Sequence, residues 1–584
     1  MTLDVSGDNE FEARARALVQ DGSLGYDQKV RRLAALATEM LPYPLISAAC
    51  EEALSKRVIC DMYEGNAPFT ARYILPDYEK AIRQGLAHLE MPPPTTLADA
   101  LAFLQIMYSQ VPSVTTYPVY LGDLDKVLAP FVDDRISDAQ LDDALRRFWI
   151  GIDRMLPDAF VHLDLGPHDS RITRSILRVE RSLRQAVPNI TLKVDPSVTP
   201  DDLIEDAVLT VFQTGKPHFV NHPMMVGDHG DQYAAVSCYN SLKIGGGAHT
   251  LVRVNLKEVA LRHTGSTDEF LATTLPHYVE LTAELAEARV RSLVEQQHFF
   301  DTHWLATEGL IDIDRFSAMF GIFGLAECVN LLMAYEHAGS EARYGHDAAA
   351  DALGRRVVER VAELVAQRPM PYCEGGNGFC YLHSQSGIDL DNDVTAGTRI
   401  PVGDEPSMFE HINTCAPHHR FFASGISDIF HVDETAVRNP RAVVDIIRGA
   451  FASGMRDFTF NLDGNEFVEY AMGLRSVTLG HAWPSVLAAA AAQMQLGQNF
   501  GRPSPVEVEC AESLIDMVPS VEMVRFAKDG STGNTAAINL ARAATGRTLV
   551  ALCHDHPFCS YDDWAMVVTQ RQKCPSGRCP SEFD

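Results

Sequence analysis

The amino-acid sequence predicts an α/β protein, because segments with the alternation of a β-strand are interleaved with segments of helical periodicity. Residues 249–256 (HTLVRVNL) alternate like a strand, and residues 257–263 (KEVALRH) follow with helical spacing. Near the end of the chain, a strand-like segment at 521–527, a helical segment at 530–546 and a second strand-like segment at 547–553 follow one another. This is the order of a βαβ unit, so the interleaving favours α/β over all-α architecture.

The N-terminal part is expected to be helical. Apolar residues recur at helical spacing from Phe11 to Ala35 and from Leu45 to Ala53. The proline-rich stretch Met91–Thr96 (MPPPTT) is a rigid breaker, so a boundary is expected there. Further on, Thr199–Asp202 has the pattern of a capping box with proline at the first helical position, and residues 268–310 are mostly helical.

The character of the sequence changes near Arg456. Asp463-Gly464 is a hairpin signal between two aromatic-rich strands, and Pro484–Gly497 is typical of a helix that begins with proline and ends with glycine. The last stretch, 570–584, has no periodicity and is expected to be a loose tail. These changes predict four segments: an N-terminal helical region (1–95), a central α/β region (96–457), a second α/β segment (458–566) and a tail (567–584).

Charge and composition exclude several classes of partner. The chain of 584 residues has 49 basic and 78 acidic residues and a formal net charge of −29. Such a surface repels phosphate backbones and anionic lipid, so we expect neither nucleic-acid nor membrane binding. Residues 1–19 lack the apolar core of a secretory signal, and no apolar run reaches the ~18 residues of a membrane span. We therefore expect a cytoplasmic protein whose 12 cysteines are mostly free thiols.

One cysteine is followed by a glycine-rich turn. Cys238 comes shortly before Gly245, Gly246 and Gly247, which open the strand-like segment at 249–256. Three successive glycines let the backbone turn tightly and approach other groups closely, so a cysteine held on such a turn inside a barrel would present its sulfur to a substrate. Judged on composition alone, the position favours an ordinary structural thiol.

The wider sequence gives this cysteine a context. The segments concerned are TYPVYLGDLDKVLAPF, GIDRMLPDAFVHLDLGP, AVPNITLKVDP, SCYNSLKIGGGAHTLVRVNL, FSAMFGIFGLAECVNLLM and VTAGTRIPVGDEP. Together they resemble the YjjI-type glycyl radical enzymes over about residues 40–455. The resemblance implies a ten-stranded α/β barrel in which a finger loop carries Cys238 to the centre. In glycyl radical enzymes this cysteine becomes a thiyl radical and removes hydrogen from a small-molecule substrate. The resemblance also implies a radical-SAM activating enzyme as partner.

Further candidate contacts to a substrate are polar residues expected near the barrel mouth. They are His162, His222, Glu374, Asn377 and His383. Ordinary loop or core chemistry stays the alternative for each of them. Glu327 and Cys328 lie on a helix expected beneath the loop, where core packing is favoured. No metal site is expected, because the cysteine spacings match no zinc motif.

The sequence departs from this family in one respect. Glycyl radical enzymes store their radical on a glycine near the C-terminus, in a loop that resembles Arg-Val-x-Gly-Tyr, and no such string occurs here. The nearest string is Arg475–His481 (RSVTLGH), in which the spacing is wrong. We therefore expect that the chain as written carries no glycyl radical, which leaves Cys238 without an evident route to a thiyl radical.

A second motif lies between an expected strand and an expected helix. On its own, the turn Asp529–Thr532 favours an ordinary helix cap, although its amides and the Ser531 hydroxyl also suit a phosphate group. With NLDGNEF, LGHAWP, VEMVRFAKDGSTGNTAAINLARAATGR and YDDW, however, residues 458–566 resemble class III aminotransferases that use pyridoxal phosphate (PLP), especially the glutamate-1-semialdehyde aminomutase type.

This second resemblance implies an incomplete PLP site in a partial aminotransferase-type α/β segment. Gly530, Ser531 and Thr532 match the phosphate cup, and Tyr561 matches the aromatic residue that stacks on the pyridine ring. The lysine that holds PLP should follow far downstream, but the lysine after the cup is Lys573, in the expected tail. Without a lysine opposite the cup, PLP transamination has no resting state.

Three hypotheses follow for the function. The first is a glycyl radical enzyme scaffold of YjjI type, inactive as written, joined to a truncated aminotransferase segment by gene fusion or a reading-frame change. The second is a PLP-dependent aminotransferase or aminomutase that a partner completes. The third is a non-catalytic pseudoenzyme scaffold. The substrate is not specified by the sequence, and a homodimer is left open.

Overall fold

The computed structural model contains two compact units, Met1–Asn465 and Glu466–Asp584. We call them the barrel unit and the C-terminal unit. The structure describes residues 9–39, 43–61, 70–111, 118–155, 160–236, 240–336, 342–384, 394–462, 483–496, 504–527, 529–547 and 550. The sequence analysis expected the second segment to begin at 458, whereas the barrel unit extends to Asn465 and includes one more strand.

A six-stranded sheet forms one side of the barrel unit. In spatial order its strands are β12 (Asp428–Val432), β13 (Asp457–Leu462), β6 (His218–Asn221), β5 (Asn189–Val194), β4 (Phe160–Leu165) and β3 (Pro118–Asp123). Strands β3 to β6 are parallel to one another, and β12 is parallel to β13. The two groups run in opposite directions, because β13 pairs with β6 in antiparallel register.

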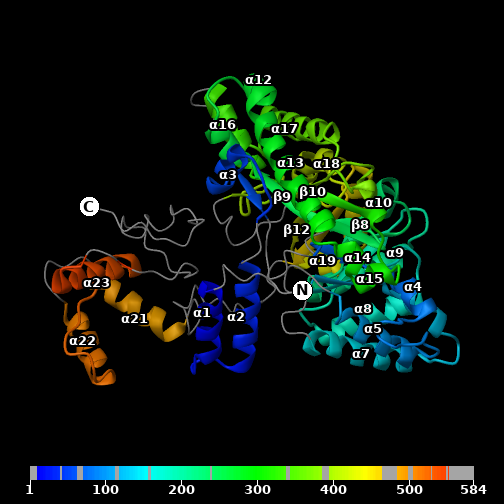
Figure 1. Ribbon diagram of the computed structural model, residues 1–584, viewed down its shortest axis with the longest axis horizontal. Coiled ribbons are helices and arrows are strands. Elements are labelled where there is room, and N and C mark those ends of the chain that lie inside the picture. Colours follow the sequence, from blue (N-terminus) through cyan, green and yellow to red (C-terminus); the bar gives the residue numbers. More distant parts are fainter. Residues whose placement is uncertain are drawn as a thin grey trace. The chain divides into compact units, whose positions relative to one another are not determined.

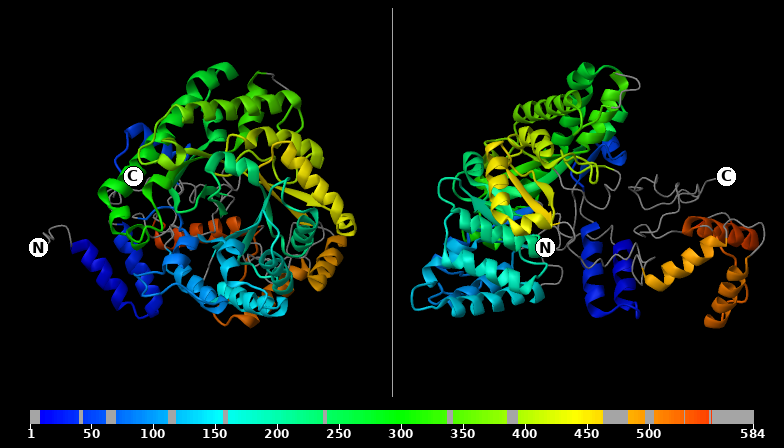
Figure 2. Two further views of the ribbon diagram at one scale, coloured as in Figure 1. Left: turned by 90° about the vertical axis from the view of Figure 1, so that its right-hand side faces the viewer. Right: turned by 180° about the vertical axis from the view of Figure 1, so that it is seen from behind.

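A second sheet has three parallel strands at its centre. They are β9 (Gly246–Asn255), β10 (Phe316–Phe323) and β11 (Tyr381–Ser384), and the short strands β1 (Ile59–Asp61) and β2 (Tyr73–Leu75) pair with β9 in antiparallel register. Backbone hydrogen bonds from Ser384 to Gly425 (2.9 Å) and from Ser424 to Leu382 (3.2 Å) connect β11 to the segment that leads into β12. The two sheets thus continue one another as the wall of an α/β barrel (Figures 1 and 2).

Helices cover the outside of this wall, as the left view of Figure 2 shows. The six-stranded sheet is covered by α7 (Asp138–Met155), α8 (Arg171–Leu183), α9 (Asp201–Thr214) and α20 (Pro440–Ala452), and the second sheet by α11 (Leu256–Leu261), α13 (Leu275–Arg291), α16 (Leu325–Glu336) and α17 (Ala348–Ala366). The leucine, valine and phenylalanine side chains on the outer face of the strands pack against these helices in two apolar clusters.

The barrel unit contains further α-helices among its described residues. They are α1 (Asn9–Gln20), α2 (Tyr26–Glu39), α3 (Ala48–Ser55), α4 (Tyr78–Gln84), α5 (Leu97–Tyr108), α6 (Leu124–Leu128), α10 (His222–His229), α12 (Thr267–Glu269), α14 (Phe299–Thr302), α15 (Trp304–Thr307), α18 (Met408–His419) and α19 (Glu434–Arg438). The expected break at Met91–Thr96 is where α5 begins, with Thr96 and Asp99 forming a capping box. The start of α9 differs from the expectation, because Pro200 is the N-cap residue and makes no side-chain cap.

The C-terminal unit contains three described helices, α21 (Pro484–Gln495), α22 (Pro505–Met517) and α23 (Gly530–Thr545), drawn in orange and red in Figure 1. None of them buries a residue within the described part of the unit. The expected strand at 521–527 is not a strand, because no described segment pairs with it. The expected turn Asp463-Gly464 lies outside the described residues, as does nearly all of the expected strand at 547–553.

Most expected elements of the barrel unit are confirmed. The strand at 249–256 is the end of β9, the helix after it is α11, and residues 268–310 are largely helical. The α/β class is also confirmed. Among the described residues, no helix combines the length and the apolarity that crossing a membrane requires.

Candidate active site inside the barrel

A short hairpin lies inside the barrel wall and carries the candidate cysteine in its connection. Strand β7 (Tyr233–Val236) pairs with β8 (Asn240–Lys243) in antiparallel register, with Val236 opposite Asn240. Both of these residues are buried, at 5% and 0% exposure. Cys238 itself, with residues 237 and 239, lies outside the described residues. The flanks of Cys238 are therefore enclosed by protein on both sides.

Two side chains of the wall and one backbone carbonyl hold the hairpin by hydrogen bonds to its backbone. The backbone N–H of Ala235 donates to the Asp164 carboxylate (3.0 Å), and the Lys193 ammonium donates to the Tyr233 carbonyl (2.8 Å). On the other edge, the Ser241 N–H donates to the Ser424 carbonyl (3.0 Å). Because buried backbone groups must be paired, these three bonds fix the position of the hairpin in the barrel.

The lysine that holds the hairpin belongs to a buried ion network. Its ammonium lies 2.5 Å from Asp123 Oδ1 and 3.5 Å from Asp164 Oδ2, and it stands 4.2 Å from the centre of the Tyr233 ring. Burial raises the pKa of Asp164 to about 8, and the charge of Asp123 adds to this. Burial alone would raise the pKa of Asp123 as well, but the charges of Lys193 and Lys126 outweigh it and lower that pKa. The two carboxylates thus differ in their affinity for a proton.

The glycine-rich turn after the hairpin is required by close packing. Gly245 and Gly247 have positive φ angles of 72° and 156°. A Cβ on Gly247 would overlap the Tyr73 carbonyl oxygen, and one on Gly246 would overlap the Arg315 carbonyl. The turn therefore admits only glycine, which agrees with the reason for which the sequence analysis singled it out.

Polar residues line the interior face of the six-stranded sheet. Side chains alternate along a strand, and the outward-facing residues of β4, β6 and β13 pack in the apolar cluster, so His162, His218 and Asp457 face inward. His218 Nδ1 lies 3.6 Å from Asp457 Oδ1. Asp457 is 1% exposed, and neither carboxylate oxygen accepts a hydrogen bond from a residue that the structure describes. Burial lowers the pKa of His162 to about 3, and the nearby His218 and Lys216 contribute, so its imidazole is neutral.

The second sheet adds positive charge to the interior. In the sheet register, Arg253 of β9, Gly321 of β10 and His383 of β11 lie side by side. Arg253 is 2% exposed and His383 is 1% exposed, and His383 Nδ1 lies 3.2 Å from the Ser424 carbonyl. Burial lowers the pKa of His383 to about 3, and the charges of Arg72 and Arg253 lower it further. Gly321 has no side chain, which leaves room for the side chain of Arg253. A Cβ at position 321 would overlap the Cβ of Arg253.

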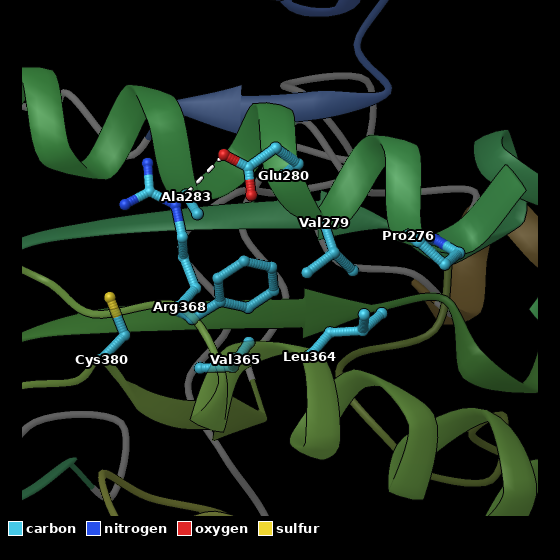
Figure 3. Close-up of a pocket in the computed structure, with 9 residues that line it drawn as sticks. Pro276, Val279, Glu280, Ala283, Leu364, Val365, Arg368 and Cys380 are labelled. Carbon is cyan, nitrogen blue, oxygen red and sulfur yellow. Dashed lines mark hydrogen bonds and ion pairs between the residues drawn. The ribbon is translucent and has the colours of Figure 1, made fainter. Parts of the chain in front are cut away.

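A separate small cavity lies on the outer side of the second sheet, between α13, β10 and α17 (Figure 3). Its volume is about 50 Å³, and its lining is mainly apolar, with Val279 and Leu364 among the residues. The ion pair between Arg368 and Glu280 (3.1 Å) borders it, as the dashed line in Figure 3 shows. The cavity is too small for a metabolite and is separated from the hairpin by the sheet, so it is not part of the candidate site.

Comparison with known proteins identifies the family. A family model described as "Glycyl radical enzyme YjjI-like" matches residues 24–472. The chain is 46% identical to protein YjjI of Escherichia coli K12 over 468 residues, which are 80% of this chain and 89% of that protein. The chain belongs to the YjjI-like glycyl radical enzymes. The first resemblance found in the sequence is thereby confirmed.

The solved structures agree on the fold. An anaerobic ribonucleotide reductase from Thermotoga maritima, with glycerol in its active site, superposes with a TM-score of 0.60 at 11% identity. The match covers 77% of the YjjI-like chain and 86% of the reductase. At this identity the likeness concerns the barrel fold alone. It confirms the expected glycyl-radical-enzyme type of barrel.

The second resemblance is confirmed over a short segment. Glutamate-1-semialdehyde 2,1-aminomutase of Chloroflexus aurantiacus is 40% identical over 100 residues, which are 17% of this chain and 23% of the aminomutase. The chain therefore spans less than a quarter of that relative.

The structure places three of the expected substrate contacts of the YjjI-like barrel in or beside its interior. His162 and His383 are buried in the interior, and His222, which opens α10, lies 2.9 Å from the Tyr233 hydroxyl of the hairpin. Glu374 and Asn377 are exposed in a turn before β11, and their contact with a substrate stays a prediction.

Other expected features of the barrel unit have a packing role. Cys328 of α16 is fully buried, and Glu327 accepts hydrogen bonds from the backbone and hydroxyl of Thr395 (3.0 and 2.5 Å), as core packing predicts. The sequence analysis missed His218, Asp457 and Arg253. Arg253 interrupts the apolar run of β9, and Asp457 begins the alternation of β13, so these two patterns are the signals that could have revealed them, whereas the short strand of His218 carries no such pattern.

The expected phosphate cup coincides with an ordinary helix cap. Gly530, Ser531 and Thr532 form the first turn of α23, and the Asp529 carboxylate accepts the Thr532 N–H (2.8 Å). An anionic side chain at this helix end occupies an amide that a phosphate would need and repels it. Tyr561 and Lys573 lie outside the described residues, and the described residues of the C-terminal unit include no lysine. The described part of this unit therefore does not fit PLP.

Proposed function

We propose that the barrel unit is the catalytic body of a glycyl radical enzyme in which Cys238 forms the thiyl radical. The buried β7–β8 hairpin carries this proposal, because the residues on both sides of Cys238 are enclosed in the polar interior of the barrel. The membership in the YjjI-like family supports it. The substrate is a small molecule that lies between the hairpin and the inward faces of the two sheets.

The chemistry is a hydrogen-atom transfer. The sulfur radical of Cys238 forms an S–H bond while one C–H bond of the substrate breaks, so that a carbon radical and a thiol result. In the reverse step a product radical takes a hydrogen atom from the Cys238 thiol, whose S–H bond breaks and restores the sulfur radical. The buried interior excludes water and protects radicals from side reactions. The neutral imidazoles of His162 and His383 and the carboxylate of Asp457 are positioned to exchange hydrogen bonds with a polar substrate.

The source of the radical is a separate question, and here we propose that the residues after the barrel do not supply the glycine. Residues that follow the family match at 472 resemble an aminomutase instead, and they contain no Arg-Val-x-Gly-Tyr-like string. The chain as written is then inactive in hydrogen abstraction until a glycine loop is provided. Its natural partner is a radical-SAM activating enzyme, and its place is the cytoplasm.

The test compares the chain with a chimera in which residues 473–584 are replaced by the C-terminal part of E. coli YjjI. Both are incubated without oxygen with the radical-SAM activating enzyme of that relative, and the glycyl doublet is recorded by electron paramagnetic resonance. We expect a doublet in the chimera and none in the original chain. A doublet in the original chain would refute the missing glycine, and its absence from both would refute the radical function of the barrel.

The role of Cys238 is tested in heavy water with the same chimera. In heavy water the Cys238 thiol carries deuterium, because a thiol exchanges its hydrogen with solvent. When the radical moves back and forth between Cys238 and the glycine, this deuterium replaces the hydrogen on the glycine Cα. The doublet splitting, which comes from that hydrogen, then collapses. The variant Cys238→Ala should keep the splitting in heavy water. The matched control Cys328→Ala removes a buried thiol outside the hairpin and should behave like the parent. Collapse of the splitting in Cys238→Ala would assign the exchange to another group.

For the C-terminal unit we propose that it does not transaminate. The similarity to the aminomutase favours a PLP function, but the described residues present Asp529 rather than an open phosphate cup. The protein is mixed with PLP, reduced with borohydride and digested for mass spectrometry. Scattered labelling of exposed lysines is expected. A single stoichiometric pyridoxyl adduct on one lysine, together with amino-group transfer, would make the aminotransferase hypothesis the better one.

A further inference from the structure

Helix α18 presents three metal-ligand side chains on one face. His411, Cys415 and His419 follow one another at intervals of four residues, so they lie in a row along the helix. The row faces Asp428 at the start of β12, on the outer side of the barrel wall, where the register places Asp428 beside Phe458. All four side chains are buried, between 0% and 6% exposed.

One of the histidines is tied to the carboxylate in a fixed orientation. The backbone N–H of Arg456 donates to His419 Nδ1 (2.9 Å), which leaves the proton of this imidazole on Nε2. His419 Nε2 then donates to Asp428 Oδ2 (3.1 Å). This arrangement orients the carboxylate and leaves its other oxygen, Oδ1, directed towards the remaining two residues of the row.

The other two residues approach that oxygen with the spacing of metal ligands. His411 Nε2 lies 3.3 Å from Asp428 Oδ1, and the ligand atoms of His411, Cys415 and Asp428 all lie within 4.8 Å of one another. A charge-assisted N–H···O bond is usually about 2.7–2.9 Å long, so 3.3 Å is long for a buried one. Two ligands that are each about 2.0–2.1 Å from a tetrahedral ion are separated by about 3.3 Å. The 3.3 Å spacing therefore fits two ligands of one tetrahedral ion as well as it fits the direct hydrogen bond between the two groups.

We propose that His411, Cys415 and Asp428 bind a divalent transition-metal ion, with Zn²⁺ as the preferred ion. An imidazole, a thiolate and a carboxylate are all zinc ligands, and three of them leave a fourth position for water. His419 acts as the outer partner of the carboxylate, a role that raises metal affinity in known sites. The sequence analysis expected no metal site because it considered cysteine pairs, whereas this set combines a His–Cys pair at i, i+4 with a distant aspartate.

The consequence of such a site is structural and independent of the radical chemistry. The ion would tie α18 to β12 across the outer face of the wall, and through His419 it would reach the backbone of Arg456 just before β13. Zinc has no redox chemistry of its own, so it is compatible with a thiyl radical elsewhere in the barrel. The interior residues that face the hairpin are on the opposite side of the sheet.

The first experiment measures metal in the full chain. The protein is produced with added zinc, freed of loosely bound ions by gel filtration, and analysed for metal and for X-ray absorption at the zinc edge. We expect about one zinc per chain, with one sulfur and otherwise nitrogen or oxygen neighbours. A protein that keeps less than about a tenth of an equivalent of zinc and shows no change in Tm when zinc is added would overturn the proposal. The four residues would then form a hydrogen-bonded network only.

The second experiment assigns the ligands with Co²⁺, which reports a bound thiolate by a charge-transfer absorption band. The band should appear in the wild type and disappear in Cys415→Ser. It should persist in the matched control Cys328→Ser, which alters a buried cysteine of α16 outside the set. His419→Asn should keep the band but weaken cobalt binding about 10–100-fold, as loss of an outer partner does. A band that survives Cys415→Ser would place the metal at other cysteines and refute this site, whether or not the variant is less stable.

Discussion

The two units of the chain differ in what covers their apolar side chains. In the barrel unit, helices such as α8 and α13 bury their apolar faces against strands, and the strands alternate between that cluster and a polar interior. In the C-terminal unit, α22 has a capping box and α23 has the Asp529 cap, yet neither these helices nor α21 buries a residue within the described part. Leu540 is 71% exposed and Met494 is 61% exposed.

This difference shows that periodicity predicts a helix but not its stability. Most of the stability of a helix in a protein comes from the tertiary packing of its apolar face. The barrel unit has the whole of its sheet available for that packing. The similarity to the aminomutase extends over 100 residues and covers 23% of that enzyme, so most of the surface that such helices would pack against in an aminomutase lies beyond the match.

The largest expected effect is in proteolysis. A segment without buried contacts opens with a free energy near zero, whereas a core strand opens only with global unfolding, which costs about 5–15 kcal/mol in a typical domain. Under native conditions, a broad-specificity protease should therefore cleave within α22 and α23 at least about a thousandfold faster than within β9 or β10. Mapping the cleavage sites by mass spectrometry over time measures this ratio.

A shortened chain provides the control for that experiment. Removal of residues 466–584 should leave the thermal transition of the barrel unit within about 2 °C, because the two units are compact by themselves. Equal protection of both units, or loss of the barrel transition after the removal, would show that the C-terminal unit has a packed partner.

The buried ion network should give the next largest effect. Lys193→Met removes the cation between Asp123 and Asp164 and leaves the carboxylates buried without it, so the free energy of unfolding should fall by up to about 5 kcal/mol. Urea denaturation of the shortened and the full chain measures it. The matched change Arg525→Met in the C-terminal unit alters an exposed cation and should stay within about 0.5 kcal/mol. A loss below about 1 kcal/mol for Lys193→Met would mean that water or a second cation compensates.

The boundary between the units can be tested at Phe458. Its ring is fully buried and lies 5.1 Å from the ring of Phe451 and 5.5 Å from that of Phe430. Phe458→Ala should cost about 3 kcal/mol, the lower end of the range for a buried phenylalanine, because the neighbouring rings can close part of the cavity. Leu540→Ala in α23 is the matched change and should cost less than about 0.5 kcal/mol. Similar losses at both positions would contradict the comparison.

The order of elements in the barrel unit could be predicted because each of them has its own local signal. The alternation at 249–256 identifies β9, and the break at Met91–Thr96 identifies the start of α5. The sequence analysis placed most of strand β13 in the second segment. In the structure this strand pairs with β6, whose residues lie about 240 positions earlier in the chain. No local pattern contains such a partner.

The candidate site was predictable only in part for the same reason. Cys238 and the glycines after it are neighbours in sequence, so the motif could be seen before the structure. Asp164 and Lys193 are on different strands, and their role in holding the hairpin follows from the order of the parallel sheet. Glu374 and Asn377 lie in an exposed turn before β11, and their contact with a substrate stays a prediction.

The smallest expected effect concerns the cap of α23, and it decides between the two readings of the Asp529–Thr532 turn. If Asp529 is an ordinary N-cap, Asp529→Ala should destabilise the helix by about 1 kcal/mol, because the Thr532 N–H loses its acceptor. Asp529→Asn keeps a capping oxygen and should cost less than half of that. Hydrogen exchange of the amides in the first turns of α23 measures both changes without requiring the unit to unfold cooperatively.

If the turn were instead a phosphate cup, Asp529→Asn would remove a charge that repels phosphate, and inorganic phosphate would then slow exchange in the variant but not in the wild type. An equal lack of response to phosphate in both proteins would leave the turn as an ordinary helix cap.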